Sequence, residues 1–331
     1  MNLDLEGIKM SKYFLKRIFT MIPVFIGLSI IIFTLINIAP GDPYTNIVEG
    51  EISISASDKE DALKSIGYYD PMHVKYGKWI GKVIKGDLGT SIRYNEPVSD
   101  IIQRRIKNTF LLSMITLILT TIIAIPLGII SAVKPYSKTD KILTILAFIG
   151  ISIPGFFVAL LVVKIFAVNL KWFPISGMSS LGKNLTGFSK FCDVGKHMIL
   201  PILSMTIIEI ASLMRYTRSA MMDVFSENYI KTARAKGLGE KLVVYKHAFR
   251  NALIPIVTLL SMSLGYIFTG TILIETIFVW PGMGTLFYQS IANRDYPVVM
   301  GCALIFSASI LIANLLSDFI YSIVDPRIRF K

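Results

Sequence analysis

Side chains that could carry out chemistry are few and widely spaced in this chain. Its three histidines, His73, His197 and His247, lie far apart, and no His-Glu-x-x-His or Gly-x-Ser-x-Gly motif occurs. Cys192 and Cys302 match no metal-binding spacing and are not expected to form a disulfide. A phosphate-binding loop of the form Gly-x-x-x-x-Gly-Lys-Ser/Thr is also missing. The sequence therefore predicts neither catalysis, ATP hydrolysis included, nor a cofactor or metal held by this chain.

Charged side chains instead gather in a basic segment, residues 229–255, between two long apolar stretches. Residues 229–236 and 240–250 favour helix, and residues 237–239 between them tolerate the positive φ of a sharp turn. Apolar side chains that could seat the second helix against the ends of the membrane spans are Leu242, Val243, Phe249 and Leu253. Two interpretations fit this composition: a loop that grips anionic lipid headgroups, and a helix–turn–helix that docks a partner.

The composition is that of a membrane protein. Hydrophobic residues make up 53% of the chain and charged residues 17%, with a mean hydropathy of +0.62. The apolar residues form blocks close to the roughly 20 residues that a helix needs to cross a hydrocarbon core of about 30 Å. These blocks are residues 18–39, 109–133, 142–168, 198–214, 252–279 and 298–324. Because lipid offers the backbone no hydrogen-bond partners, each must be helical, which predicts an all-α polytopic protein with six transmembrane helices. Pro126, Pro154 and Gly155 predict breaks or kinks within these spans.

The spans divide the chain into parts. These are a cytoplasmic N-terminal tail (1–17), a first span that is retained rather than cleaved (18–39), an outer loop (40–108) and a transmembrane core (109–331) that contains a basic loop (215–251). In the outer loop, apolar residues recur at helical spacing after Pro71 and again after Pro97. This pattern predicts two amphipathic helices along the outer face, with residues 86–89 forming a turn between them.

Lysine and arginine set the orientation of the spans. They are concentrated before span one, between spans two and three, between spans four and five, and after span six. The positive-inside rule therefore places these segments and both termini in the cytoplasm. The lysines of the outer segment 169–197 oppose the rule, which holds in sum rather than loop by loop. Anionic lipid at the cytoplasmic surface explains the net charge of +12, and no nucleic-acid partner is expected.

The basic segment also carries a family resemblance. Residues 233–238 (Ala-Arg-Ala-Lys-Gly-Leu) and 247–255 (His-Ala-Phe-Arg-Asn-Ala-Leu-Ile-Pro) resemble the EAA-type loop of ATP-binding-cassette importer permeases, in the version of the dipeptide, oligopeptide and nickel group. The general motif has Glu-Ala-Ala where this chain has Lys231-Thr-Ala, and Gly237 lies further from Pro255 than in sugar importers; both departures are similar to the peptide group. Further motifs resemble that group's B-type subunit, in the same order and over nearly the whole chain from Ser11. They are Ala39-Pro-Gly-Asp-Pro, Gly86-Asp-Leu-Gly-Thr-Ser, Ser152-Ile-Pro-Gly-Phe, Glu275-Thr-Ile-Phe-Val-Trp-Pro-Gly-Met-Gly, Arg294-Asp-Tyr-Pro-Val and Asp325-Pro-Arg-Ile.

This resemblance implies a type I importer (MetI-like) permease fold and a subunit that forms half of a translocation pathway. Its implied partners are a second, homologous permease in a heterodimer, two cytoplasmic ATPase subunits that bind ATP and Mg²⁺, an external substrate-binding protein and membrane lipid. The short helix of the basic loop would sit in a cleft of an ATPase subunit. The residues expected to couple there are Tyr229, Ala233, Arg234, Ala235, Lys236, Gly237, Leu238, His247, Arg250 and Asn251.

Charged residues inside the apolar blocks are costly, at roughly 2.5–3.5 kcal/mol each near the middle of the bilayer. Glu209 and Glu275 are the candidates for the translocation pathway, and Glu275 also opens the Trp-Pro-Gly segment, where a turn near the outer surface is expected. Lys164 and Asp318 lie near span ends, where they either pair locally or snorkel, or else line the pathway.

Other classes of membrane protein are weaker alternatives. An ion-coupled secondary transporter would show inverted repeats and charges near broken helices, whereas no clear repeat is seen and intramembrane charges are sparse. A membrane-embedded enzyme would need a catalytic constellation.

For the cargo, the resemblance favours di- and oligopeptides, with nickel or a metal chelate as the alternative. A site for bare metal would need clustered His, Cys or carboxylate ligands, but selectivity in this family usually resides in the binding protein, so both cargoes stay open.

Overall fold

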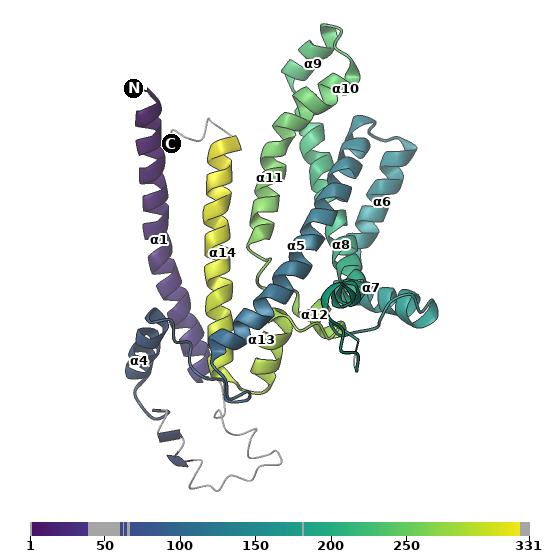
Figure 1. Cartoon of the computed structure of the whole chain (residues 1–331). Helices are drawn as coiled ribbons and strands as arrows, with labels where there is room; N and C mark the ends of the chain where they lie inside the picture. Colours follow the sequence, from purple (N-terminus) through teal and green to yellow (C-terminus); the bar gives the residue numbers. More distant parts are fainter. Residues whose placement is uncertain (1, 39–59, 62, 65–66, 181, 325–331) are drawn as a thin grey trace. The chain divides into compact units, whose positions relative to one another are not determined.

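The computed structural model describes residues 2–38, 60–61, 63–64, 67–180 and 182–324, so the motifs at 39–43 and 325–328 lie outside the described residues (Figure 1). The described residues form helices joined by turns and loops, with no strand. The named helices are α1 (Asn2–Ile38), α4 (Met72–Ile84), α5 (Val98–Val133), α6 (Lys138–Ser152), α7 (Gly155–Val162), η1 (Val163–Asn169), α8 (Gly187–Ser226), α9 (Asn228–Ala235), α10 (Glu240–Leu242), η2 (Val243–Phe249), α11 (Arg250–Leu264), α12 (Ile272–Ile277), α13 (Met283–Ala292) and α14 (Tyr296–Val324).

The predicted membrane spans correspond to these helices. Within the described residues, α1, α5, α8, the continuous rod α10–η2–α11 and α14 are each long and apolar enough to cross a membrane. The bent pair of α6 with α7–η1 would form a sixth span. The predicted all-α, polytopic fold class is confirmed, and the predicted N-terminal tail continues the helix of the first span within α1.

The third predicted span is sharply bent. Helix α6 ends at Ser152 and α7 begins at Gly155, with a change of direction of 102° between α6 and the rod α7–η1. Pro154 has no backbone N–H to continue the helix, and it holds Ile153 in an extended conformation with φ −83° and ψ 127°. The predicted break at Pro154 is confirmed, whereas the size of the bend did not follow from the sequence pattern.

The fifth predicted span is shorter than expected. Helix α11 ends at Leu264, and after a turn-rich segment the short helix α12 begins at Ile272, so the prediction of one helix over 252–279 is wrong. Gly270 lies in this break with φ +68°, and a Cβ there would collide with the carboxylate of Glu275. The left-handed conformation and the close approach both require glycine, and together they interrupt the helix.

The chain divides into two compact units, the first formed by residues up to 108 with residues 282–315. In this unit α4 packs on α1: the hydroxyls of Tyr76 and Ser29 are 2.8 Å apart, and Phe33 contacts the rings of Tyr76 and Trp79. The amphipathic helix predicted after Pro71 is therefore confirmed, with its apolar side on a neighbouring helix. The helix predicted after Pro97 is not a separate element, because it forms the first turns of α5.

A buried carboxylate organises the segment between α4 and α5 in the first unit. Asp295 is 1% exposed and accepts hydrogen bonds from the Ser91 hydroxyl and from the backbone N–H groups of Ile92 and Arg93. The Ser91 hydroxyl oxygen in turn accepts the N–H of Tyr94 at 2.9 Å. Two of the sequence motifs, at 86–91 and 294–298, are thus the two halves of one junction, which lies beside an apolar cluster of α5, α13 and α14.

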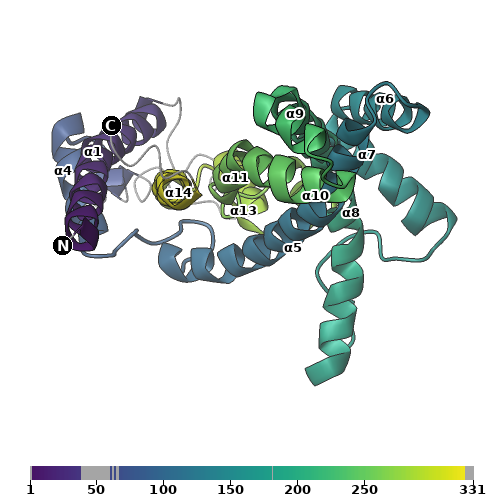
Figure 2. The ribbon, with the colours of Figure 1, turned by 90° about the horizontal axis from the view of Figure 1, so that it is seen from above.

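The second unit, residues 109–281 with 316–331, contains two apolar clusters along α8. One joins α5, α7, η1, α8 and α12 and includes the fully buried side chains of Phe278 and Trp280. The other joins α5, α6, α8, α9, η2 and α11. Seen from above, α5, α6, α8 and α11 form a group, and the first turns of α8 run away from it (Figure 2). The unit thus holds residues 229–255 against one end of a helical group.

Substitution of Asp295 tests the junction of residues 86–91 with 294–298. Asp295→Ala leaves the buried Ser91 hydroxyl and the amides of Ile92 and Arg93 without their acceptor, which is expected to cost at least about 2 kcal/mol, because hydrogen bonds to charged groups contribute most. Hydrogen–deuterium exchange of these amides in the detergent-purified protein should accelerate, and the thermal midpoint should fall.

The matched control is Glu96→Ala in the same loop, which removes only a solvent-exposed ion pair with Arg104 and should cost under about 1 kcal/mol. Unchanged exchange in the Asp295 variant would show that the loop keeps its conformation without the carboxylate.

Candidate docking site

The basic segment forms a helix–turn–helix at the end of α8 (Figure 1). The first arm is α9, whose helix closes with the N–H of Gly237 bonded to the carbonyl of Arg234 at 2.9 Å. Gly237 has φ +76°, which confirms the predicted left-handed turn. Gly239, two residues later, has φ −59° and begins the second arm in an ordinary conformation. The turn therefore depends on one glycine.

The second arm continues directly into a span. Helix α10 begins at Glu240 and passes through η2 into α11, which ends at Leu264. The helix predicted over 240–250 is present but does not stop at Arg250. The second arm and the span are therefore helical without a break from Glu240 to Leu264, with a π-helical stretch at Val243–Phe249 and Pro255 inside α11.

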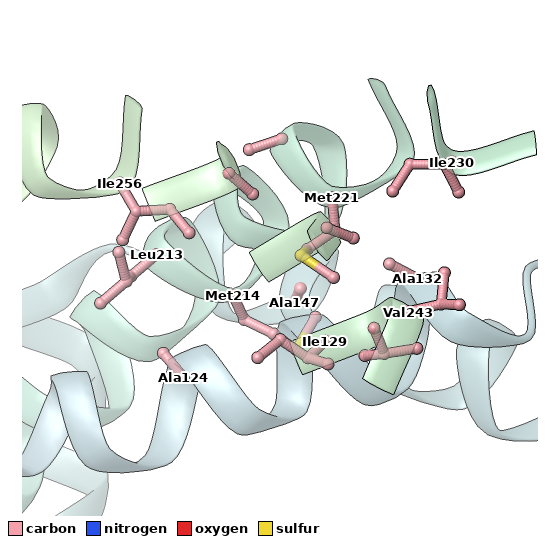
Figure 3. Close-up of a cluster of buried hydrophobic side chains, with 14 of the residues drawn as sticks. Ala124, Ile129, Ala132, Ala147, Leu213, Met214, Met221, Ile230, Val243 and Ile256 are labelled. Atoms are coloured by element: carbon pink, nitrogen blue, oxygen red, sulfur yellow. The ribbon is translucent and has the colours of Figure 1, made fainter. Parts of the chain in front are cut away.

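Apolar side chains on one side of both arms hold the helix–turn–helix against the bundle (Figure 3). Ile230 and Val243 are fully buried in the cluster that also contains Met221 of α8 and Ala147 of α6. Ala233, one of the predicted coupling residues, is only 8% exposed, so it faces this cluster. Of the side chains predicted to seat the second arm, Val243, Phe249 and Leu253 are buried or half-buried, whereas Leu242 is 42% exposed and was assigned wrongly.

An ion pair braces the turn. The Arg234 guanidinium donates to the Glu240 carboxylate at two points, with Nη2–Oε1 2.6 Å and Nε–Oε2 3.2 Å. The same guanidinium lies over the ring of Phe225, 5.4 Å from its centroid. Arg234 therefore links the end of α8 to both arms. Asn251, another predicted coupling residue, donates to the carbonyl of His247 within the second arm.

The other side of the helix–turn–helix is an exposed face of aromatic, apolar and basic side chains. Tyr229 is 44% exposed, Leu238 37%, Leu242 42% and Tyr245 60%. Partial burial, together with the carboxylate of Glu227, raises the pKa of the Tyr229 phenol. The exposed residues Ala235, Lys236, Gly237, Lys241, Lys246, Arg250 and Asn251 lie on the two arms and the turn between them, and His247 is half-buried.

Leu242 and Tyr245 are apolar and aromatic members of this face that do not occur among the predicted coupling residues. A signal was available, because Val243, Val244 and Ala248 share one side of a helix and residues 242 and 245 then fall on the other. Tyrosine and leucine exposed among basic residues are found both at protein contacts and at lipid headgroups.

The two acidic pathway candidates have different surroundings. Glu209 of α8 is half-buried and accepts a hydrogen bond from the Thr120 hydroxyl at 3.3 Å. Glu275 is fully buried at the first turn of α12, where it accepts the Thr109 hydroxyl at 2.7 Å and lies against Gly270. Each lies 20 residues from the nearer end of the segment 229–255, and Glu275 also stabilises the break after α11. No group of three or more His, Cys, Asp or Glu suited to a metal ion occurs in the described part of the chain.

A family model described as "binding-protein-dependent transport system inner membrane component" matches residues 124–330. The chain belongs to this family. It is therefore a multi-pass membrane protein and the permease subunit of a binding-protein-dependent importer, which confirms the resemblance seen in the motifs.

Curated relatives match this permease over their whole length. The oligopeptide transport system permease protein AppB of Bacillus subtilis is 41% identical, and the match covers 97% of this chain and 100% of AppB. The dipeptide transport system permease protein DppB of Escherichia coli K12 is 37% identical, and the glutathione transport system permease protein GsiC of Salmonella paratyphi A is 35% identical, with the same coverages. A solved chain of the MetNI methionine ABC transporter, 16% identical, has a TM-score of 0.54 over 68% of this chain and 96% of its own, and it supports the MetI-like fold.

The two glycines of the permease's turn offer a matched test. Gly237→Ala adds a side chain where φ is +76°, which should destabilise the turn by about 1 kcal/mol or more, whereas Gly239→Ala should be tolerated. Neither added Cβ meets an atom within 4 Å, so the difference reports backbone conformation alone. Hydrogen exchange of the amides of residues 234–242 should accelerate in Gly237→Ala only. Equal exchange in the two variants would contradict the assigned turn.

Proposed function

We propose that this permease imports di- and oligopeptides and that residues 229–255 are the surface through which an ATPase subunit drives it. The observation that carries the proposal is the exposed aromatic and basic face of the helix–turn–helix, on a chain whose relatives are named as oligopeptide, dipeptide and glutathione permeases. Both termini and residues 215–251 are assigned to the cytoplasm by the distribution of lysine and arginine.

The physical basis of coupling is the continuity of the arms with the spans. Helix α9 follows α8 with a single intervening residue, and α10 leads without a break into α11. A partner that clamps the turn at Gly237 and then shifts would push on both rods together. The ion pair between Arg234 and Glu240 keeps the angle between the arms, so that the shift is transmitted rather than absorbed by the loop.

The exposed side chains of the arms supply the contact. Tyr229, Leu238, Leu242 and Tyr245 offer apolar area, and Tyr229 and Tyr245 also carry a hydroxyl, which suits a partly wet interface. Lys236, Lys241, Lys246 and Arg250 favour an acidic rim on the ATPase and steer its approach. Ala233 is part of the motif that resembles the family but does not belong to the exposed face. Its small side chain allows α9 to lie close to the bundle.

The chain supplies half of the pathway in this proposal. A second, homologous permease would complete it, an external binding protein would deliver the cargo, and two ATPase subunits would bind ATP and Mg²⁺. Glu209 is the better of the two acidic candidates for a pathway contact, since its side chain is partly accessible and Glu275 is fully enclosed. A peptide carries an ammonium group, which a carboxylate on the pathway can attract without a dedicated binding site.

Removal of one exposed ring tests the docking surface. Tyr245→Ala should reduce the amount of ATPase subunit that co-purifies with the permease by about tenfold, because tyrosines at the centre of an interface are frequent hot spots. Tyr136→Ala is the matched control, since Tyr136 is 76% exposed in the turn between α5 and α6, at the same end of the helical group. Equal retention of the ATPase by both variants would show that the docking surface lies elsewhere.

The cargo is tested at the binding protein that the permease accepts. Native mass spectrometry of that protein, purified from the producing cells, should show bound peptides, and its peptide-loaded form should stimulate ATP hydrolysis by the reconstituted complex. Mutation of Glu209→Gln should lower the uptake of peptides with a free amino terminus more than that of N-acetylated peptides. A binding protein that carries nickel or a metal chelate, and uptake of that metal by the complex, would replace the peptide assignment.

A further inference from the structure

A buried carboxylate close to the helix–turn–helix joins three helices at one point. Asp140, in the first turn of α6, is 2% exposed. The Arg218 guanidinium of α8 donates to it twice, with Nε–Oδ1 2.7 Å and Nη2–Oδ2 2.8 Å. The Ser131 hydroxyl near the end of α5 donates to Oδ1, and the Tyr136 N–H in the intervening turn donates to Oδ2 at 2.8 Å. The Thr144 hydroxyl adds a longer contact of 3.3 Å. The carboxylate is thus fully satisfied by groups from α5, α6 and α8.

The position of Asp140 is set by the sequence around it. The Ser137 side chain caps α6 by accepting the Asp140 N–H at 3.2 Å, so the carboxylate is held in the first turn of the helix. The first turn is also the place where a negative charge is favoured by the helix dipole. A two-point contact between carboxylate and guanidinium is directional, and it fixes the sliding position and the rotation of α6 on α8.

Small residues bring the same helices into close contact. A Cβ on Gly128 of α5 would lie 2.6 Å from the Thr217 Cβ and 2.8 Å from the Met214 carbonyl oxygen of α8. A Cβ on Gly150 of α6 would lie 2.9 Å from the Cβ of Ala211, also on α8. At such distances the backbones leave little room for the helices to approach further, but smooth contacts of this kind do not by themselves prevent sliding.

The apolar cluster around these contacts reaches the docking segment (Figure 3). Ile129 and Ala147, from α5 and α6, share it with Ile230 of α9 and Val243 of η2. Burial of apolar area resists separation of these elements, yet it is not directional and specifies the position of one helix along another only weakly. A force applied to the helix–turn–helix would therefore reach α6 reliably only if a directional contact fixes α6 to α8.

We propose that Asp140 and Arg218 are positioning residues that lock α5, α6 and α8 into one rigid lever moved by the docking segment. This inference rests on the proposed function, because it assigns the path by which the ATPase stroke reaches the bent span formed by α6, α7 and η1. The contact between Asp140 and Arg218 stays formed through the transport cycle, and α5, α6 and α8 move as one body. Without it, the ATPase would still bind and turn over, but its stroke would be lost as sliding between α6 and α8.

The test uses the complete transporter with its ATPase subunits, partner permease and peptide-loaded binding protein in proteoliposomes. Arg218→Lys keeps the positive charge but loses the two-point geometry, and the double variant Asp140→Asn with Arg218→Met removes both charges while keeping an acceptor for the Ser131 hydroxyl. Removing both charges avoids a stranded buried ion, so the double variant is expected to fold and assemble. Peptide taken up per ATP hydrolysed should fall roughly three- to thirtyfold in the double variant, and less in Arg218→Lys.

The matched control is Arg215→Gln, an exposed arginine one turn earlier on α8, which should leave the ratio of uptake to hydrolysis unchanged. Co-purification of the ATPase subunits should be the same in all variants, because the exposed face of the helix–turn–helix is not altered. A merely structural role would lower the amount of assembled complex without changing the ratio of uptake to hydrolysis in what remains. A double variant as tightly coupled as the unsubstituted complex would overturn the proposal.

Different results would contradict the docking of the ATPase on the helix–turn–helix and the lever formed by α5, α6 and α8. If the docking assignment is wrong, the Tyr245→Ala permease will retain its ATPase subunits. If only the lever assignment is wrong, Tyr245→Ala will still release the ATPase, whereas the Asp140 and Arg218 variants will transport with the normal yield of peptide per ATP.

Discussion

The constraint on which the structure depends is that lipid cannot hydrogen-bond to a peptide chain. Every backbone N–H and C=O within a span must pair inside its own helix. Several hydroxyls in these helices also bond within their own helix: Thr116 donates to the carbonyl of Leu112 and Ser204 to that of Leu200, each four residues earlier. Helices whose polar groups pair internally in this way have few groups left to form directional contacts with other helices.

Recognition between elements is therefore concentrated where helices end. Asp295, Asp140 and Glu275 each lie in a turn or in the first turn of a helix, and each accepts hydrogen bonds from residues that belong to another element. At such places the backbone has N–H groups without intrahelical partners, and those of Ile92 and Tyr136 are used. A carboxylate in the middle of a span would find no such donors. These three buried carboxylates thus lie at junctions between elements, where they fix the relative position of segments that apolar packing would leave free to slide.

This distribution explains which features could be predicted from the sequence. The spans, the arms of the helix–turn–helix and the left-handed Gly237 follow from local patterns of hydropathy and turn residues. The Ser91–Asp295 contact joins residues 204 positions apart, and nothing in either motif indicates the other as its partner. The break after Leu264 was missed for the same reason: a run of apolar residues favours one long helix, while the close approach of Glu275 to Gly270 that interrupts it depends on tertiary contact.

The continuity of the second arm with α11 could not be predicted because the second arm is rich in charged residues. Lys241, Lys246 and Arg250 look like a loop between spans, but they occupy one side of a helix whose other side, with Val243 and Ala248, is buried. A polar surface on an uninterrupted helix has a mechanical consequence. A flexible loop would dissipate a push from a partner within its own backbone, whereas a segment that is helical from Glu240 to Leu264 passes more of the push on to the span. In the proposed mechanism, the charged length of this helix lies in water within reach of the ATPase, and the apolar length carries the displacement into the bundle.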